Sequence, residues 1–138
     1  MSMDAYYGDY ASPMFIGALK DGYNYVTLLV SPMALRSRGT VTIKSADTAD
    51  LPIVDPNWLT DPIDQEVAVA GFKRARELFA TEAVRAVLAD PVEHSPGLAV
   101  ETDEQILDAI RTTLSALFHA SATCRMGTAD DPDAVVDR

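Results

Sequence analysis

Residues 40–45 read Thr-Val-Thr-Ile-Lys-Ser, and residues 51–56, after a short polar break, read Leu-Pro-Ile-Val-Asp-Pro. In the first stretch, Val41 and Ile43 point to one side while the threonines and the lysine point to the other. This alternation is typical of a strand with one buried face. The second stretch is short and extended, because a proline lies at each end of it. The pair predicts a β-structured region near the start of the chain.

A long helix is predicted directly after this region. Asp61 offers a side-chain cap and Pro62 occupies the first helical position, so the helix should run from Pro62 to about Ala80. A shorter helix is predicted from Glu82 to Leu88. The apolar side chains of the long helix favour one buried face, made of Ile63, Val67, Ala70 and Leu78, with Phe72, Ala75 and Phe79 beside them.

A further helix is predicted after the proline- and glycine-containing stretch 90–100. Thr102 followed by Gln105 has the form of a capping box. Behind it comes an apolar stripe at helical spacing, which consists of Ile106, Ile110, Leu114 and Leu117. This stripe predicts a helix whose C-terminus leads directly to His119.

The N-terminal part of the chain is less regular. Residues 24–30 are rich in β-branched and aromatic side chains and apolar on both sides, which predicts a strand covered on both faces. Residues 1–22 carry tyrosines and glycines without a period, so we expect an irregular arm there.

Composition excludes several classes of function. The chain has 138 residues, 48% of them hydrophobic, which suits a single domain with a core. Its net charge of −10 argues against binding to nucleic acid or anionic membranes. It has neither a signal peptide pattern nor an apolar run long enough to cross a bilayer. The single cysteine, Cys124, excludes an internal disulfide, so we expect a soluble cytoplasmic protein.

Two histidines and one cysteine are the residues to consider for chemistry. His119 precedes a run of small residues that would let a ligand approach, and an imidazole there can take or give a proton. Spacing and composition alone favour a hydrogen-bonded core histidine. We expect Cys124 to be structural and His94 to face solvent. The spacing predicts no metal site, and no G-x-G-x-x-G fingerprint for a dinucleotide is present.

Four stretches in order carry a specific resemblance. Residues 35–47 contain a Ser-Arg-Gly turn leading into a strand that ends in Ser-Ala-Asp, and residues 51–59 contain Pro-Ile-Val-Asp-Pro-Asn-Trp-Leu. A helix-like stretch at 61–79 and the sequence Phe-His-Ala-Ser-Ala-Thr-Cys-Arg-Met-Gly at 118–127 follow. In this order and spacing, residues 24–138 resemble the C-terminal, substrate-side segment of the glucose–methanol–choline (GMC) oxidoreductases.

The resemblance implies an α+β fold, with an antiparallel or mixed sheet and helices packed on one of its faces. It also implies that His119 is the acid/base residue, which removes the hydroxyl proton of an alcohol while hydride passes to the flavin. Thr123 and Cys124 would shape the backbone behind it. Ala120 and Ala122 depart from the family's usual proline and glycine, and the added methyl group at Ala122 bears on how the turn is formed.

The resemblance implies FAD as the cofactor, bound in the family by a Rossmann-like domain that carries the glycine fingerprint. Because this chain has no such fingerprint, we expect it not to bind FAD alone. The family's second catalytic residue, a histidine or asparagine beyond the His119 motif, is not recognised either. We expect a sheet edge that is covered by a second copy or by a complementing chain.

Three functions stay open from the sequence. The first is the substrate-side part of a flavin-dependent alcohol oxidase or dehydrogenase of small-molecule or secondary metabolism. The second is a cofactor-free isomerase, cyclase or dehydratase that uses the same pocket for a small apolar substrate. The third is a binding remnant without chemistry.

Overall fold

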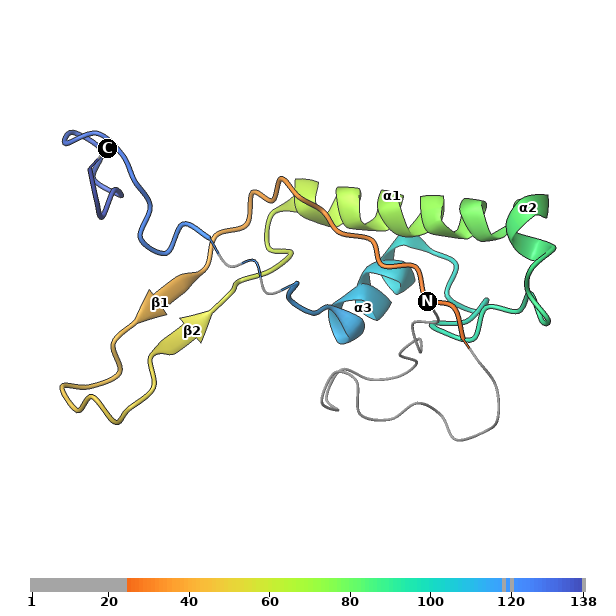
Figure 1. Cartoon of the computed structure of the whole chain (residues 1–138), viewed down its shortest axis with the longest axis horizontal. Helices are drawn as coiled ribbons and strands as arrows, with labels where there is room; N and C mark the ends of the chain where they lie inside the picture. The colour runs from red at the N-terminus through yellow and green to blue at the C-terminus, as the bar shows by residue number, and fades with distance from the viewer. Residues whose placement is uncertain (1–24, 118, 120, 138) are drawn as a thin grey trace. The chain divides into compact units, whose positions relative to one another are not determined.

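The computed structural model describes residues 25–117, 119 and 121–137. Its elements run in the order β1 (Thr40–Thr42), β2 (Ile53–Asp55), α1 (Pro62–Phe79), α2 (Glu82–Arg85) and α3 (Asp103–Thr113) (Figure 1). The chain divides into two compact units. The helical unit comprises residues 25–36 and 59–114, and the hairpin unit comprises residues 37–58 with the described residues after 114.

Capping side chains set the starts of the two longer helices, as predicted. The carboxylate of Asp61 accepts a hydrogen bond of 2.8 Å from the backbone N–H of Ile63, and Pro62 occupies the first turn of α1. At α3, the Thr102 hydroxyl accepts from the backbone N–H of Gln105, and the Gln105 side chain accepts from that of Thr102. Both arrangements satisfy N–H groups that have no partner within the helix.

The core of the helical unit lies where α1 packs against α3. Ile106 of α3 is 1% exposed. The other buried apolar residues are Leu59, Ala68 and Val69. Burying a side chain the size of isoleucine contributes about 2–3 kcal/mol. This contact therefore supplies much of the local stability.

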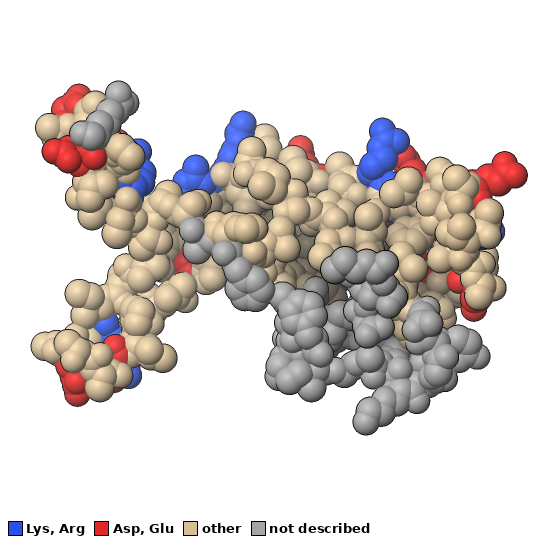
Figure 2. Space-filling view, in the orientation of Figure 1, with Lys and Arg blue, Asp and Glu red and all other residues tan. Residues whose placement is uncertain are grey.

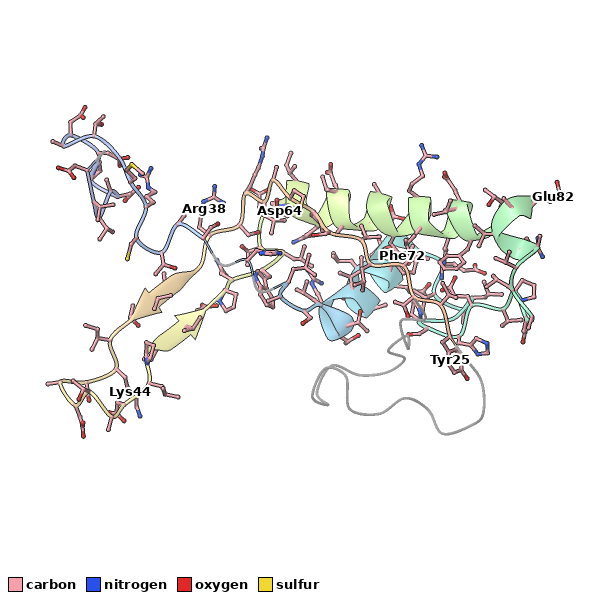
Figure 3. The ribbon with its side chains drawn as sticks, viewed as in Figure 1. Tyr25, Arg38, Lys44, Asp64, Phe72 and Glu82 are labelled. Carbon is pink, nitrogen blue, oxygen red and sulfur yellow. The ribbon has the colours of Figure 1, made fainter. Side chains whose placement is uncertain are left out.

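The predicted buried face of α1 is wrong. Ile63, Val67 and Leu78 are 41–50% exposed. The buried residues are instead Asp64 and Ala68, which are four positions apart on the helix. Figure 3 shows Asp64 in the first turn of α1. Both oxygens of its carboxylate accept from the backbone N–H of Arg36, at 2.8 and 3.1 Å. A charged side chain is buried here because it binds a backbone donor of a crossing segment.

The strand predicted at residues 24–30 is wrong for the part that the structure describes. Residues 25–30 are extended but belong to neither strand, and Val26 and Leu29 are 66% and 59% exposed. Val30 lies against α1, where a Cβ at Gly71 would come within 2.6 Å of its side chain. No strand among the described residues pairs with this segment, so apolar composition alone did not produce a sheet strand.

Two helix ends also differ from the prediction. α2 ends at Arg85 rather than Leu88, and α3 ends at Thr113, so its C-terminus does not lead directly to His119. Leu114 is already extended, with φ −60° and ψ 134°. The hydroxyls of Thr112 and Thr113 both donate to the carbonyl of Ala109. Bonds of this kind, together with β-branching, weaken a helix at its end.

The hairpin unit contains the antiparallel pair β1–β2, in which Thr40 faces Asp55, Val41 faces Val54 and Thr42 faces Ile53. The strand predicted in residues 40–45 is thus confirmed, at Thr40–Thr42. Its buried face is not, because Val41 is 47% exposed.

A glycine sets the start of β1. A Cβ at Gly39 would overlap the carbonyl oxygen of Asp55 and lie 2.7 Å from that of Pro56. Only glycine permits this approach of the two strands, which is a physical reason for the Ser-Arg-Gly turn.

The α+β class and the antiparallel pairing are confirmed. The covering of one sheet face by helices stays a prediction. The irregular arm expected at residues 1–22 lies outside the described residues. Among the residues that are described, every helix is too short or too polar to cross a membrane.

Candidate active-site segment and its relatives

His119 lies in irregular backbone of the hairpin unit, after the end of α3. Its side chain is exposed, so it is not a core histidine. Its neighbours Phe118 and Ala120 lie outside the described residues. An exposed imidazole is accessible to a substrate or to a second polypeptide.

Ala122, three residues after His119, adopts the left-handed backbone conformation with φ +67°. This conformation favours glycine and costs an L-residue with a Cβ about 1–2 kcal/mol. Ala122 is also the position at which the resemblance implies a glycine. The added methyl group therefore does not abolish the turn. The chain keeps a glycine-like conformation with an alanine.

The segment behind Ala122 closes into a small loop. Met126 and Val136 form a parallel bridge, in which the N–H of Gly127 donates to the carbonyl of Val136 at 3.0 Å and that of Val135 donates to Arg125 at 2.9 Å. Arg125 also forms an ion pair of 2.6 Å with Asp131 inside the loop. The motif thus ends in a structure with its own hydrogen bonds.

Two residues assigned to packing behave differently. Thr123 and Cys124 are both exposed, so the prediction that Cys124 is a buried structural thiol is wrong for the residues that the structure describes. The exposed thiol is in keeping with the rest of the hairpin unit, in which no described residue is buried.

A hydrogen bond from Thr128 lowers the pKa of Asp130, whose carboxylate is fully exposed.

A polar cluster in the helical unit was missed from the sequence. Arg76 of α1 binds the two carboxylate oxygens of Glu93 at 2.7 and 2.8 Å, and it also donates to the carbonyls of Gly97 and Val100. Its guanidinium lies 4.6 Å from the centre of the Phe72 ring. The hydrogen bond that Arg76 donates to Glu93 is the largest of the effects that raise the pKa of Arg76. This cluster holds the loop before α3 against α1.

His94 follows Glu93 of this cluster and lies at the surface. His94 is exposed, as predicted, and its ring makes an edge-to-face contact with Tyr25 at 5.4 Å between centres. The signal for the cluster was available in the sequence, since Arg76 stands four residues after Phe72. Residues at that spacing lie along the same side of a helix.

The described residues do not form a cradle for the diphosphate of FAD. A helix N-terminus binds phosphate through free N–H groups and a positive dipole. Here the first turns are acidic, with Asp64 in α1, Glu82 in α2, and Asp103 and Glu104 in α3. Pro62 moreover has no N–H to offer. These features repel a phosphate group, so the helices of this chain do not suit the cofactor's anionic end.

Other candidate sites are weak. An open depression of about 450 Å³ beside α2 is lined by Ala80, Glu82, Arg85 and Ala86, and it does not include His119. Within the described part of the chain, no three residues of His, Cys, Asp or Glu are grouped to hold a metal ion.

Comparison with known proteins is specific. Residues 36–138 match a family model described as GMC oxidoreductase. The chain is 49% identical to patulin synthase of Penicillium expansum over 137 residues, which are 99% of this chain and 22% of that protein. It is 54% identical over 117 residues to versicolorin B synthase of Aspergillus parasiticus, covering 85% of this chain and 18% of that protein.

A third relative is oxidoreductase cicC of Emericella nidulans, 42% identical over 132 residues, which are 96% of this chain and 21% of that protein. The chain therefore spans about a fifth of the length of the curated relatives it matches. The family normally uses FAD. Because the match extends over most of the sequence and includes the His119 motif, this chain belongs to the GMC oxidoreductase family.

Proposed function

We propose that this chain is the substrate-side part of an FAD-dependent oxidoreductase that oxidises the CH–OH group of a small molecule, with His119 as its acid/base residue. The observation that carries the proposal is the family match over residues 36–138, which includes His119 and the motif around it. Exposure of the His119 side chain supports the same role, because a base has to reach its substrate.

In this reaction the imidazole of His119 accepts the hydroxyl proton of the alcohol. FAD, when bound, would supply the acceptor for the hydride, that is, the hydrogen of the C–H bond together with both bonding electrons. The acidic helix N-termini of this chain support such a division of labour, since they disfavour a diphosphate. The chain alone is therefore inactive in this proposal.

The test co-expresses this chain with the part of Penicillium expansum patulin synthase that lies outside the matched region. The purified complex is assayed with a panel of aromatic primary and secondary alcohols and a dye as electron acceptor. His119→Ala should lower the rate by about 100-fold or more, the usual contribution of a general base. His94→Ala is the matched control and should leave the rate unchanged, because His94 lies at the surface of the helical unit.

Equal rates for His119→Ala and the unchanged chain in an active complex would refute the role of this histidine. Such a result would favour the binding remnant, in which the histidine has no chemical task. His119→Ala should not change the melting temperature of the chain, since the side chain is exposed.

A second candidate function rests on the relatives' names. Two of the most similar proteins are named synthases, whereas others are named oxidoreductase or dehydrogenase. A synthase reaction that moves only protons would use His119 without consuming an electron acceptor. Product formation by the complex without reduction of the dye would favour this alternative. Product formation by the chain alone would favour the cofactor-free form of it.

A further inference from the structure

Three non-glycine residues among those that the structure describes adopt a left-handed backbone conformation. They are Asn57, Leu59 and Ala122, with φ of 50°, 56° and 67°. In this conformation the Cβ lies too close to the following carbonyl oxygen, so it persists only where something else offsets the steric cost. The three positions differ in what offsets it.

Contacts within the chain offset the cost at two of these positions. The side chain of Asn57 donates to the carbonyl of Arg38 at 2.8 Å, and its N–H donates to the carboxylate of Asp55 at 2.9 Å. Leu59 is 7% exposed, and its carbonyl accepts from the side chain of Gln65 at 2.8 Å. Hydrogen bonds and burial therefore account for the left-handed conformation at both residues.

Ala122 lacks both kinds of compensation within the described part of the chain. Its side chain is exposed, and its backbone makes no hydrogen bond with another described residue. The backbone just behind it is fixed, because the carbonyl of Arg125 accepts from the N–H of Val135 at 2.9 Å. Strained residues that the fold does not explain are concentrated at functional sites. Ala122 is thus the position at which a functional reason for the strain has to be sought.

The surroundings of Ala122 suit an uncharged ligand. Ala122 follows His119 by three residues, so their Cα atoms are at most about 11 Å apart, and both side chains are exposed. Residues 121–124 carry no charged side chain. Figure 2 shows the acidic side chains of this segment gathered toward the C-terminal end that Figure 1 marks. A methyl group offers no hydrogen bond, so Ala122 distinguishes between ligands by their size alone.

We propose that the Ala122 side chain determines specificity by limiting the size of the substituent on the carbinol carbon of the substrate. This proposal rests on the proposed function and names the substrate class of the same site, which is primary alcohols in preference to branched secondary alcohols. A substituent on the carbinol carbon lies next to the hydroxyl group that His119 binds, and it meets the methyl group of Ala122. One methylene group in such a contact changes kcat/KM by about tenfold or more.

The experiment uses two forms of the enzyme. One is the complex of this chain with the unmatched part of Penicillium expansum patulin synthase, and the other is a chimera in which this chain replaces the matched region of that protein. The rate constant kcat/KM is measured for benzyl alcohol, 1-phenylethanol and 1-phenylpropanol, which differ only in the substituent on the carbinol carbon. A change of folding or flavin content alters all three values together, whereas a change of pocket size alters their ratio.

Ala122→Gly should raise kcat/KM for 1-phenylpropanol relative to benzyl alcohol by about tenfold, because it removes the methyl group. Ala129→Gly is the matched control. Ala129 is exposed in the same unit and does not have a left-handed backbone, so the same chemical change there should leave the ratio unchanged.

A second variant separates side-chain size from backbone strain. Asparagine adopts the left-handed conformation more readily than alanine, yet its side chain is larger. Ala122→Asn should therefore lower the same ratio by about tenfold, in the direction opposite to Ala122→Gly. A shift of the ratio in the same direction for both variants would show that the backbone matters rather than the side chain, and the proposal would be overturned.

A further measurement needs no turnover. Benzaldehyde and propiophenone, the carbonyl products of the smallest and the largest alcohol, are titrated into both enzyme forms while the flavin absorbance is followed. The ratio of their dissociation constants should shift by about tenfold toward propiophenone in Ala122→Gly. Equal ratios for all variants in turnover and in binding, or no binding of either compound by either enzyme form, would contradict the proposal.

The two proposals fail separately. If His119→Ala keeps full activity while the ratio still follows residue 122, the catalytic role of the histidine is refuted and the size limit stands. If His119→Ala is inactive and every variant at position 122 has the same ratio, the proposed function stands and the role of the Ala122 side chain is refuted.

Discussion

The helical unit and the hairpin unit differ in where their apolar side chains go. The residues identified as buried, namely Leu59, Asp64, Ala68, Val69 and Ile106, all belong to the helical unit. In the hairpin unit, Val41, Ile43 and Val54 face solvent. Both units come from one sequence of ordinary hydrophobic content. The helical unit carries its own core, whereas the described residues of the hairpin unit include no buried side chain.

This difference has a physical origin in the connections of each unit. In the helical unit, polar side chains of α1 bind backbone groups of the segments that cross it, as Asp64 does with Arg36 and Arg76 does with Val100. Each such bond both holds the segment and satisfies a polar group near the core. The hairpin is held mainly by strand pairing and the close approach at Gly39. The described residues thus provide no layer that covers Val41 and Val54.

The largest effect that sharpens this comparison is expected from Ile106→Ala. Removing a side chain that is 1% exposed should lower the free energy of unfolding by about 3 kcal/mol, because a cavity is left where α3 meets α1. Val54→Ala, made in the 60% exposed hairpin side chain, should change it by less than about 0.5 kcal/mol. Urea unfolding followed by circular dichroism measures both. Similar losses for the two variants would break the distinction between the units.

An intermediate effect is expected from Arg76→Ala. The variant removes the ion pair with Glu93 and leaves the Gly97 and Val100 carbonyls without this donor, so unfolding should become easier by about 2 kcal/mol. Because the hydrogen bond to Glu93 raises the pKa of Arg76, the arginine's contribution is complete at neutral pH and is lost as the pH rises to strongly alkaline values.

Arg74→Ala is the control for that variant. Arg74 pairs with Glu77 on the same helix, and both side chains are more than 60% exposed. Its loss should change the free energy of unfolding by less than about 0.5 kcal/mol. An equal loss for Arg74→Ala and Arg76→Ala would show that the bonds to the loop carbonyls contribute nothing, and the account of how the helical unit is held would fail.

The smallest effect is expected at Ala122, in the hairpin unit. Ala122→Gly should stabilise the local turn by about 1 kcal/mol, since glycine adopts φ +67° without the steric cost of a Cβ. Amide exchange of Gly127, whose N–H donates to Val136 in the same segment, should slow by about fivefold. Ala70→Gly, in the middle of α1, should have the opposite sign and destabilise by about 1 kcal/mol. If the amide hydrogen of Gly127 exchanged faster in Ala122→Gly than in the unchanged chain, the proposed steric cost of the Ala122 Cβ would be refuted.

Local signals were sufficient for the helix starts and for the strand β1, which depend on neighbouring residues. The cap at Asp61, the capping box at Thr102 and the alternation around Val41 correctly predicted α1, α3 and β1. The motif around His119 correctly indicated the family. The assignment of His119 as base stays a prediction, because no partner or ligand is defined by the residues around it.

The failures share a cause, which is that burial depends on contacts far away in the sequence. The stripe of Ile63, Val67 and Leu78 has the right period for a core face, yet α1 turns Asp64 and Arg76 toward the protein. The apolar stretch 25–30 has the composition of a strand, but the described residues contain no strand beside it. Periodicity reports which residues share a face, and it does not report what lies opposite that face.

By itself, the sequence determined the family, the helix starts, the strand at Thr40–Thr42 and the position of the one motif histidine, because each depends on residues within a few positions of one another. Tertiary structure alone decided that polar side chains of α1 face inward, that α3 ends at Thr113 before reaching His119, and that Val41 and Val54 of the hairpin are exposed. These outcomes depend on which distant segment provides a backbone donor, a carbonyl or a covering layer, and such partners are specified only when the chain is folded.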